Sequence, residues 1–113
     1  MVTPAMARLQ IYSDDLLFGS NLQAQLLAAG HEVGLGLGVE PGCDAVVADL
    51  TIDASGRVET LAGVELPVLA FYSHVDVAIR DEARAAGFAI VVPRSRIARE
   101  APVLVEQLLA TAR

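Results

Sequence analysis

The chain has 113 residues, of which 54% are hydrophobic and 19% are charged. This length is typical of one domain, and the apolar share is high enough for a packed core, which excludes a disordered chain. Eight basic residues against 14 acidic ones give a net charge of -6, which disfavours nucleic-acid binding. No apolar run approaches the ~20 residues needed to cross a bilayer. We therefore expect neither nucleic acid nor a membrane as a partner.

Residues 1–7 lack the charged start and apolar core of a signal peptide, so we expect a flexible N-terminal tail before a single domain. Cys43 is the only cysteine in the sequence, which excludes an internal disulfide and favours a cytoplasmic location. All eight basic residues are arginine. Chemistry that requires a lysine is therefore excluded.

Strands and helices alternate along the chain, which predicts a parallel sheet covered by helices. Ser13 and Asp14 follow the first predicted strand, where the N-cap of a helix belongs, and Gly30 ends that helix. We expect the last helix to begin near Pro102, because proline suits the first turn and disrupts a helix interior. The predicted strands are 9–12, 32–38, 45–49, 68–72 and 89–92, and the predicted helices are 15–29, 57–62, 76–86 and the segment after 102.

The second predicted strand has an unusual pattern, because Gly34, Gly36 and Gly38 fall on one face. Since a strand alternates sides at every residue, this face carries almost no side chains. A dinucleotide-binding fingerprint would follow the first strand and open a helix, so these glycines do not indicate one. They favour the close approach of another backbone instead.

Four segments resemble the receiver domain of response regulators, the CheY-like superfamily: LQIYSDD, DAVVADL, LPVLAFYSH and ARAAGFAIVVPRS. The resemblance covers nearly the whole chain. It implies a flavodoxin-like, doubly wound sheet of five parallel strands in the order 2-1-3-4-5. It also implies that Asp49 is the phosphoacceptor and that Asp14 belongs to the acidic pair that holds magnesium, with Ser13 in place of the first member.

The sequence departs from the receiver pattern in three places. Tyr72 stands where receivers have a switch threonine or serine, although Ser73 follows it. The receiver lysine after the fifth strand is missing, and Pro93 and Arg94 occupy its neighbourhood. The second and third predicted strands are also too close for a helix between them. We therefore expect the second receiver helix to be missing or reduced, with the glycine face left uncovered.

Polar residues follow several predicted strands at the edge where ligands bind in doubly wound sheets. Because the carboxyl ends of parallel strands meet at one edge, these residues predict a shared pocket. The predicted pocket consists of Ser13, Asp14, Asp49, Thr51, Ser73, His74, Asp76, Arg94 and Ser95.

This pocket has alternative interpretations. Asp14 and Asp49 would supply two carboxylate ligands to Mg²⁺, and Asp49 would then accept a phosphoryl group. Alternatively, Arg94 pairs with Asp49 or Asp14 and neutralises the site, which gives a pseudo-receiver that needs no cofactor. A small ligand in the same pocket is a third interpretation.

His74 lies near Ser73 and Asp76, but neighbours on one turn seldom point at each other, and the sequence has no nucleophile elbow. We expect His74 to face solvent and cap the helix that follows.

The sequence thus predicts a non-enzymatic signalling module that contacts a protein partner or a second copy. The candidate interfaces are the surface of the missing helix and the region of the fourth and fifth strands.

Overall fold

The computed structural model describes residues 6–111, which form one five-stranded parallel sheet flanked by four helices. The strands are paired in the order β2-β1-β3-β4-β5, which confirms the predicted topology. The strands are β1 (Arg8–Tyr12), β2 (Glu32–Gly36), β3 (Ala45–Asp49), β4 (Val68–Tyr72) and β5 (Ile90–Pro93). The helices are α1 (Leu16–Ala28), α2 (Ala54–Ala62), α3 (Val77–Ala85) and α4 (Arg94–Thr111).

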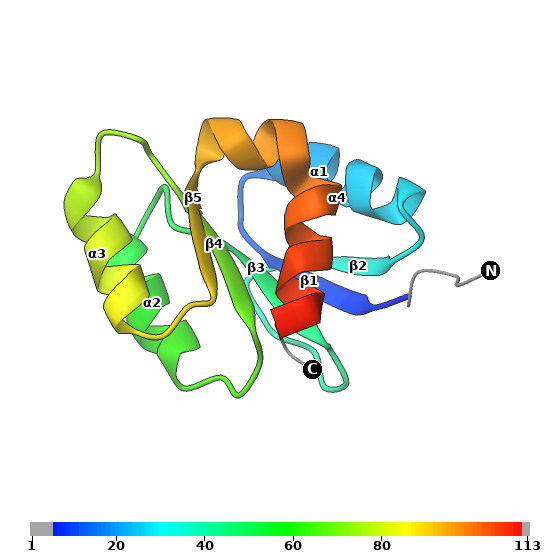
Figure 1. Ribbon diagram of the computed structural model, residues 1–113, viewed down its shortest axis with the longest axis horizontal. Helices are drawn as coiled ribbons and strands as arrows, with labels where there is room; N and C mark the ends of the chain where they lie inside the picture. The colour runs from blue at the N-terminus through cyan, green and yellow to red at the C-terminus, as the bar shows by residue number, and fades with distance from the viewer. Residues whose placement is uncertain (1–5, 112–113) are drawn as a thin grey trace.

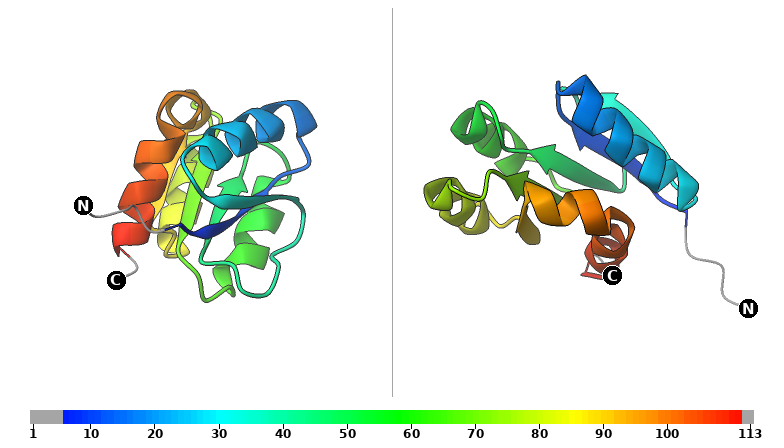
Figure 2. Two further views of the ribbon diagram at one scale, coloured as in Figure 1. Left: turned by 90° about the vertical axis from the view of Figure 1, so that its right-hand side faces the viewer. Right: turned by 90° about the horizontal axis from the view of Figure 1, so that it is seen from above.

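The helices form two pairs on opposite faces of the sheet. Figure 1 shows α2 and α3 side by side at one end, with α1 and α4 at the other, and the view from above in Figure 2 also separates the two pairs. The central strands β3 and β4 are fully buried because helices cover both of their faces. Within residues 6–111, no helix has both the length and the apolar character needed to span a bilayer.

Each face of the sheet has its own core. One core joins the sheet to α1 and α4, where Leu22 and Leu26 meet Leu104 and Leu108. The other joins the sheet to α2 and α3 through residues such as Val58, Leu61, Ile79 and Ala83. Strands β3 and β4 contribute side chains to both cores, since successive side chains of a strand point to opposite faces of the sheet.

No helix lies between β2 and β3 in the described part of the chain, which confirms the missing second helix. The connection ends beside β1 instead, where the backbone N–H of Asp44 donates to the Arg8 carbonyl at 2.7 Å. A hollow of about 400 Å³ remains between Gln10, Gly34 and Cys43. An added Cβ at Gly34 would lie only 2.8 Å from Gln10 Oε1, so a side chain from β1, rather than another backbone, approaches the glycine.

The predicted start of the last helix is wrong, because α4 begins at Arg94 rather than near Pro102. The helix is kinked at Glu100, whose φ and ψ are -126° and 20°. Pro102 has no N–H to donate to the Ala98 carbonyl, and the Gln25 side chain of α1 donates to it at 3.3 Å. Pro102 therefore opens the second part of one kinked helix.

The other boundaries differ by a few residues. Helix α2 begins at Ala54, three residues before its predicted start at Arg57, and β2 ends at Gly36 rather than at Gly38. Residues 1–5 of the predicted flexible tail lie outside the described residues. Ala7 is buried, and its backbone N–H donates to Nδ1 of His31 at 3.1 Å.

Candidate functional site

The carboxyl ends of β1, β3, β4 and β5 bring the predicted site residues to one edge of the sheet. Asp49 is the last residue of β3 and lies at the centre of this edge, only 1% exposed. Every residue of β3 is buried between the helix layers, so the carboxylate at the end of this strand is buried as well.

Both carboxylate oxygens of Asp49 accept hydrogen bonds from neighbouring residues. Ser13 Oγ donates to Oδ2 at 2.6 Å. The backbone N–H of Thr51 donates to Oδ1 at 2.9 Å, and the Thr51 hydroxyl donates to the same oxygen. Such bonds to a charged acceptor are strong, so they hold the Asp49 carboxylate in one orientation.

Arg57 is the cation of this site, and sequence reasoning did not identify it. It lies in α2, is only 5% exposed, and donates from one guanidinium nitrogen to Asp14 Oδ1 at 2.7 Å. The other nitrogen donates to the Asp49 backbone carbonyl at 3.0 Å and lies 3.9 Å from Asp49 Oδ2. The guanidinium also lies over the Tyr12 ring, 5.9 Å from its centroid. One side chain therefore contacts both acidic residues.

A sequence signal for Arg57 existed in the pattern of α2. Val58 and Leu61 are the buried apolar residues of this helix, and Arg57 lies one turn before Leu61. Positions four apart share a helix face, so Arg57 was placed to point inward toward the sheet. In a chain without lysine, an inward arginine is the available cation for a buried carboxylate such as Asp49.

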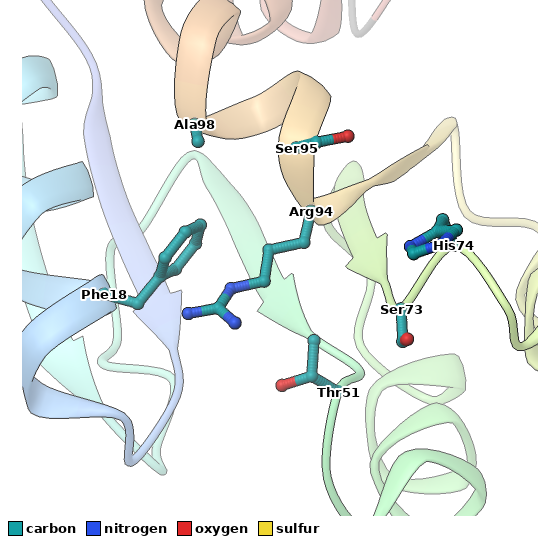
Figure 3. Close-up of a pocket in the computed structure, with 7 residues that line it drawn as sticks. All are labelled: Phe18, Thr51, Ser73, His74, Arg94, Ser95 and Ala98. Carbon is teal, nitrogen blue, oxygen red and sulfur yellow. The ribbon is translucent and has the colours of Figure 1, made fainter.

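The predicted pairing of Arg94 with Asp49 or Asp14 is wrong. The Arg94 guanidinium lies over the ring of Phe18 in α1, with Cζ 4.2 Å from the ring centroid (Figure 3). One of its nitrogens lies 3.7 Å from Asp15 Oδ2. Its side chain is about half exposed. The aromatic ring draws the guanidinium away from Asp49 by a cation–π contact.

The electrostatics at Asp14 follow from the ion pair. The hydrogen bond from Arg57 holds the pKa of the Asp14 carboxyl below its ordinary value of 3.8. Partial burial opposes this effect, while a backbone hydrogen bond and the Coulombic attraction of Arg57 support it. Asp14 is therefore stabilised in its charged form.

The helix caps also differ from the prediction. Asp15, not Ser13 or Asp14, caps α1 by accepting the Phe18 N–H at 3.0 Å. Asp76 caps α3 by accepting the Ile79 N–H at 3.1 Å, so His74 is not the capping residue, although it is exposed as expected. Asp76 thus has a structural role at the end of the site.

The remaining predicted residues line a cavity of about 610 Å³ beside Asp49. Thr51, Ser73, His74, Arg94 and Ser95 surround it, together with Phe18 and Ala98 (Figure 3). The structure therefore divides the predicted pocket into two parts: an acidic cluster of Ser13, Asp14 and Asp49 around Arg57, and an adjoining cavity around Arg94.

The acidic cluster does not fit a magnesium ion of the receiver type. Such an ion would need the carboxylates of Asp14 and Asp49 together, and the Arg57 guanidinium contacts both. Across residues 6–111, no three His, Cys, Asp or Glu side chains are grouped as metal ligands. The positive charge that a divalent cation would supply here is already provided by arginine.

Comparison with known proteins identifies the fold. No protein-family model matches the sequence, and no curated protein matches it. Among solved structures, a response regulator from Thermotoga maritima superposes with a TM-score of 0.80 at 10% identity, covering 94% of this chain and 99% of that one. A receiver domain protein from Clostridium thermocellum gives 0.80 at 13% identity, covering 95% and 97%.

The non-phosphorylated receiver domain of HemR from Leptospira biflexa gives a TM-score of 0.76 at 20% identity, covering 92% of this chain and 94% of that one. The chain therefore has the CheY-like receiver fold of response regulators, with four helices around the sheet. The edge at the carboxyl ends of its strands is acidic, and one arginine contacts both Asp14 and Asp49.

Proposed function

We propose that this chain is a signalling module that acts through contacts with another protein and is not phosphorylated on Asp49. The observation that carries the proposal is the Arg57 guanidinium, which binds Asp14 at 2.7 Å and lies 3.9 Å from Asp49 Oδ2. It gives the acidic cluster a fixed cation, which supports a module without a metal cofactor. A non-enzymatic role is part of the same proposal.

Phosphoryl transfer to Asp49 would require an accessible carboxylate and cations placed around the incoming phosphoryl group. Asp49 is 1% exposed, and both of its oxygens already accept hydrogen bonds. Arg94, the nearest substitute for the receiver lysine in the sequence, is held against Phe18. These contacts favour a receiver fold in which Asp49 stays unphosphorylated and the charge of the acidic cluster does not change.

Exposed apolar side chains supply a surface for protein contacts. Six large ones follow the carboxyl ends of four adjacent strands, in the order β2, β1, β3 and β4. Exposed apolar groups gathered on one side of a domain mark interaction sites. These residues are Leu37 after β2, Leu16 and Leu17 after β1, Ile52 after β3, and Val75 and Val77 after β4.

The charge at this edge favours a different protein over a second copy. Asp53 and Asp76, which lie apart from the ion pairs of Arg57 and Arg94, are in the same loops as the exposed apolar residues. Two copies joined edge to edge would bring these carboxylates together, and like charges across an interface are unfavourable. We infer a partner with basic and apolar side chains. We further propose that the two proteins meet in the cytoplasm, where cysteines such as the free, buried Cys43 stay reduced.

Intact mass spectrometry after incubation with acetyl phosphate and Mg²⁺ tests the phosphorylation part of the proposal. We expect the wild-type mass to stay unchanged under conditions that modify a phosphorylatable receiver used as a positive control. A gain of one phosphoryl group that disappears in Asp49→Asn would instead establish the chain as a phospho-accepting switch.

Affinity capture of partners tests the contact surface. Leu17 is 80% exposed near the start of α1, and Leu27 is 51% exposed near the end of the same helix, away from the acidic edge. We expect Leu17→Asp to lose a captured protein that Leu27→Asp retains. Equal capture by both variants would contradict the assignment of the surface.

A further inference from the structure

The cavity beside the acidic cluster has a chemistry that the proposed function does not use. Its volume of about 610 Å³ lies within the range of small-molecule sites, and it opens at the carboxyl ends of the strands, where doubly wound sheets bind ligands. Residues from four separate regions line it: Phe18 of α1, Thr51 after β3, Ser73 and His74 after β4, and Arg94 and Ser95 of α4.

The lining of this cavity is polar and includes a cation. It contains an arginine, a histidine and three hydroxyl groups, and no carboxylate is among its lining residues. The chain as a whole has a net charge of -6, and this cavity contains one of its eight arginines. Guanidinium, imidazole and hydroxyl groups together are suited to binding an oxyanion.

Arg94 is available to bind such a group. Its guanidinium lies over the Phe18 ring, with Cζ 4.2 Å from the centroid, inside the cavity (Figure 3). Asp15 Oδ2, the nearest carboxylate oxygen within the described residues, lies 3.7 Å away, beyond hydrogen-bonding distance. Asp15 also caps α1 through its other oxygen. The aromatic ring therefore orients the guanidinium, and its ion pair with Asp15 is too long to be a hydrogen bond, so Asp15 does not use its N–H donors.

Other groups extend the site around Arg94. Ser73 and His74 lie across the cavity from Phe18, at the end of β4 (Figure 3). The Thr51 hydroxyl donates to Asp49, so it would act only as an acceptor toward a ligand. Phe18, which is half-buried and lines the cavity beside Arg94, offers an apolar contact for an organic group next to the anion.

We propose that this cavity binds a small organic molecule carrying a phosphate or carboxylate group, with Arg94 as the main anion-binding residue. Binding is non-covalent and does not use Asp49 as a nucleophile. The inference goes beyond the proposed protein contacts and does not depend on them. Because the cavity and the exposed apolar residues share one edge of the sheet, a bound ligand would lie next to the partner surface.

Titration by two-dimensional amide NMR tests the proposal, with phenyl phosphate, benzoate, inorganic phosphate and phenol as probes. We expect saturable shifts at Ser73, His74 and Ser95 with phenyl phosphate or benzoate, weaker binding of inorganic phosphate and none of phenol. The stronger of the two organic anions identifies the preferred group. Intact mass is expected to stay unchanged throughout.

Arg94→Gln is the decisive variant, and Arg84→Gln is its matched control, because Arg84 is exposed on α3 outside the cavity. We expect Arg94→Gln to weaken organic-anion binding at least about tenfold, and Arg84→Gln to leave it unchanged. The absence of saturable shifts, equal binding in Arg94→Gln, equal affinity for inorganic phosphate, or a gain in covalent mass would each overturn the proposal. A gain in covalent mass would also contradict the proposal that Asp49 is not phosphorylated. The other outcomes bear on neither phosphorylation nor partner capture, so they separate the two proposals.

Discussion

Arg57 balances the charge of the acidic cluster, because within the described part of the chain it alone forms ion pairs with both Asp14 and Asp49. It joins α2 to the ends of β1 and β3 through Asp14 and the Asp49 backbone. A buried cation is retained only when its donors are satisfied, and here both guanidinium nitrogens that reach the cluster have acceptors. The residue therefore acts on both the electrostatics and the packing of the site.

Replacing Arg57 with methionine keeps most of the side-chain volume but removes the charge and the donors. We expect a loss of about 2–3 kcal/mol in the free energy of unfolding, because the Asp49 carbonyl and the nearby carboxylates lose their partner. Urea unfolding monitored by circular dichroism measures this loss. Arg84→Met, at an exposed site, should cost less than about 0.5 kcal/mol, and an equally small cost for Arg57→Met would contradict the assigned role.

Asp14 makes stability depend on pH in a defined direction. Its pKa in the folded protein lies below the ordinary value of 3.8, chiefly because of the Arg57 hydrogen bond. The stabilisation is therefore fully present above the unfolded value and is lost as the pH falls through the lower, folded value. Urea unfolding between about pH 5 and pH 2 should show a shallower loss of stability in Asp14→Asn than in the wild type. Parallel curves for the two proteins would refute the assignment.

Sequence reasoning brought the right carboxylates together and chose the wrong cation. Ser13, Asp14 and Asp49 were predictable because each follows or ends a parallel strand, and such ends share one edge. The reach of an arginine depends on what its side chain contacts along the way. Phe18 holds Arg94 away from the cluster, whereas the inward face of α2 directs Arg57 into it.

Among the elements, β2 shows how a missing helix changes a strand. Gly34 lies beside Gln10, which is 4% exposed and donates to the Ile11 and Gly36 carbonyls at 3.2 and 3.4 Å. The polar side chain of Gln10 covers the sheet where a helix would otherwise do so. The absence of a side chain at Gly34 makes room for it.

Gly34→Ala should therefore destabilise the protein by about 1 kcal/mol, because the new Cβ would stand 2.8 Å from Gln10 Oε1 and displace a hydrogen-bonded amide. Gly38→Ala is the matched control, since an added Cβ there meets nothing within 4 Å. Denaturant unfolding compares the two variants. In a Gln10→Ala background the cost of Gly34→Ala should shrink, and an undiminished cost would show that Gln10 is not its cause.

Most elements were predictable because local pattern and tertiary position agree. The buried runs of β3 and β4 have the predicted limits, 45–49 and 68–72, since helices on both faces demand continuous apolar sequence. The start of α4 was missed because Pro102 is a valid first-turn residue, yet Gln25 from another helix compensates for its missing N–H. A contact between distant segments cannot be inferred from local rules.

At the scale of the whole molecule, the two cores share a single sheet. Leu26 packs in the core of α1 and α4, while Leu61 packs in the core of α2 and α3. Strands β3 and β4 contribute alternate side chains to both cores, so neither core keeps its sheet surface if the other is lost. We expect the domain to unfold in one cooperative transition, as small single domains usually do.

The two tyrosines offer a direct test, because both report on one core only. Tyr72 is buried in the core of α2 and α3, Tyr12 packs against the same core, and the sequence has no tryptophan. Leu26→Ala, in the opposite core, should cost about 2–5 kcal/mol through the cavity that it leaves. Tyrosine fluorescence and far-ultraviolet circular dichroism should then shift to the same lower denaturant midpoint. A tyrosine transition that stays at the wild-type midpoint would show that the cores unfold independently, because the shared strands would have failed to couple them.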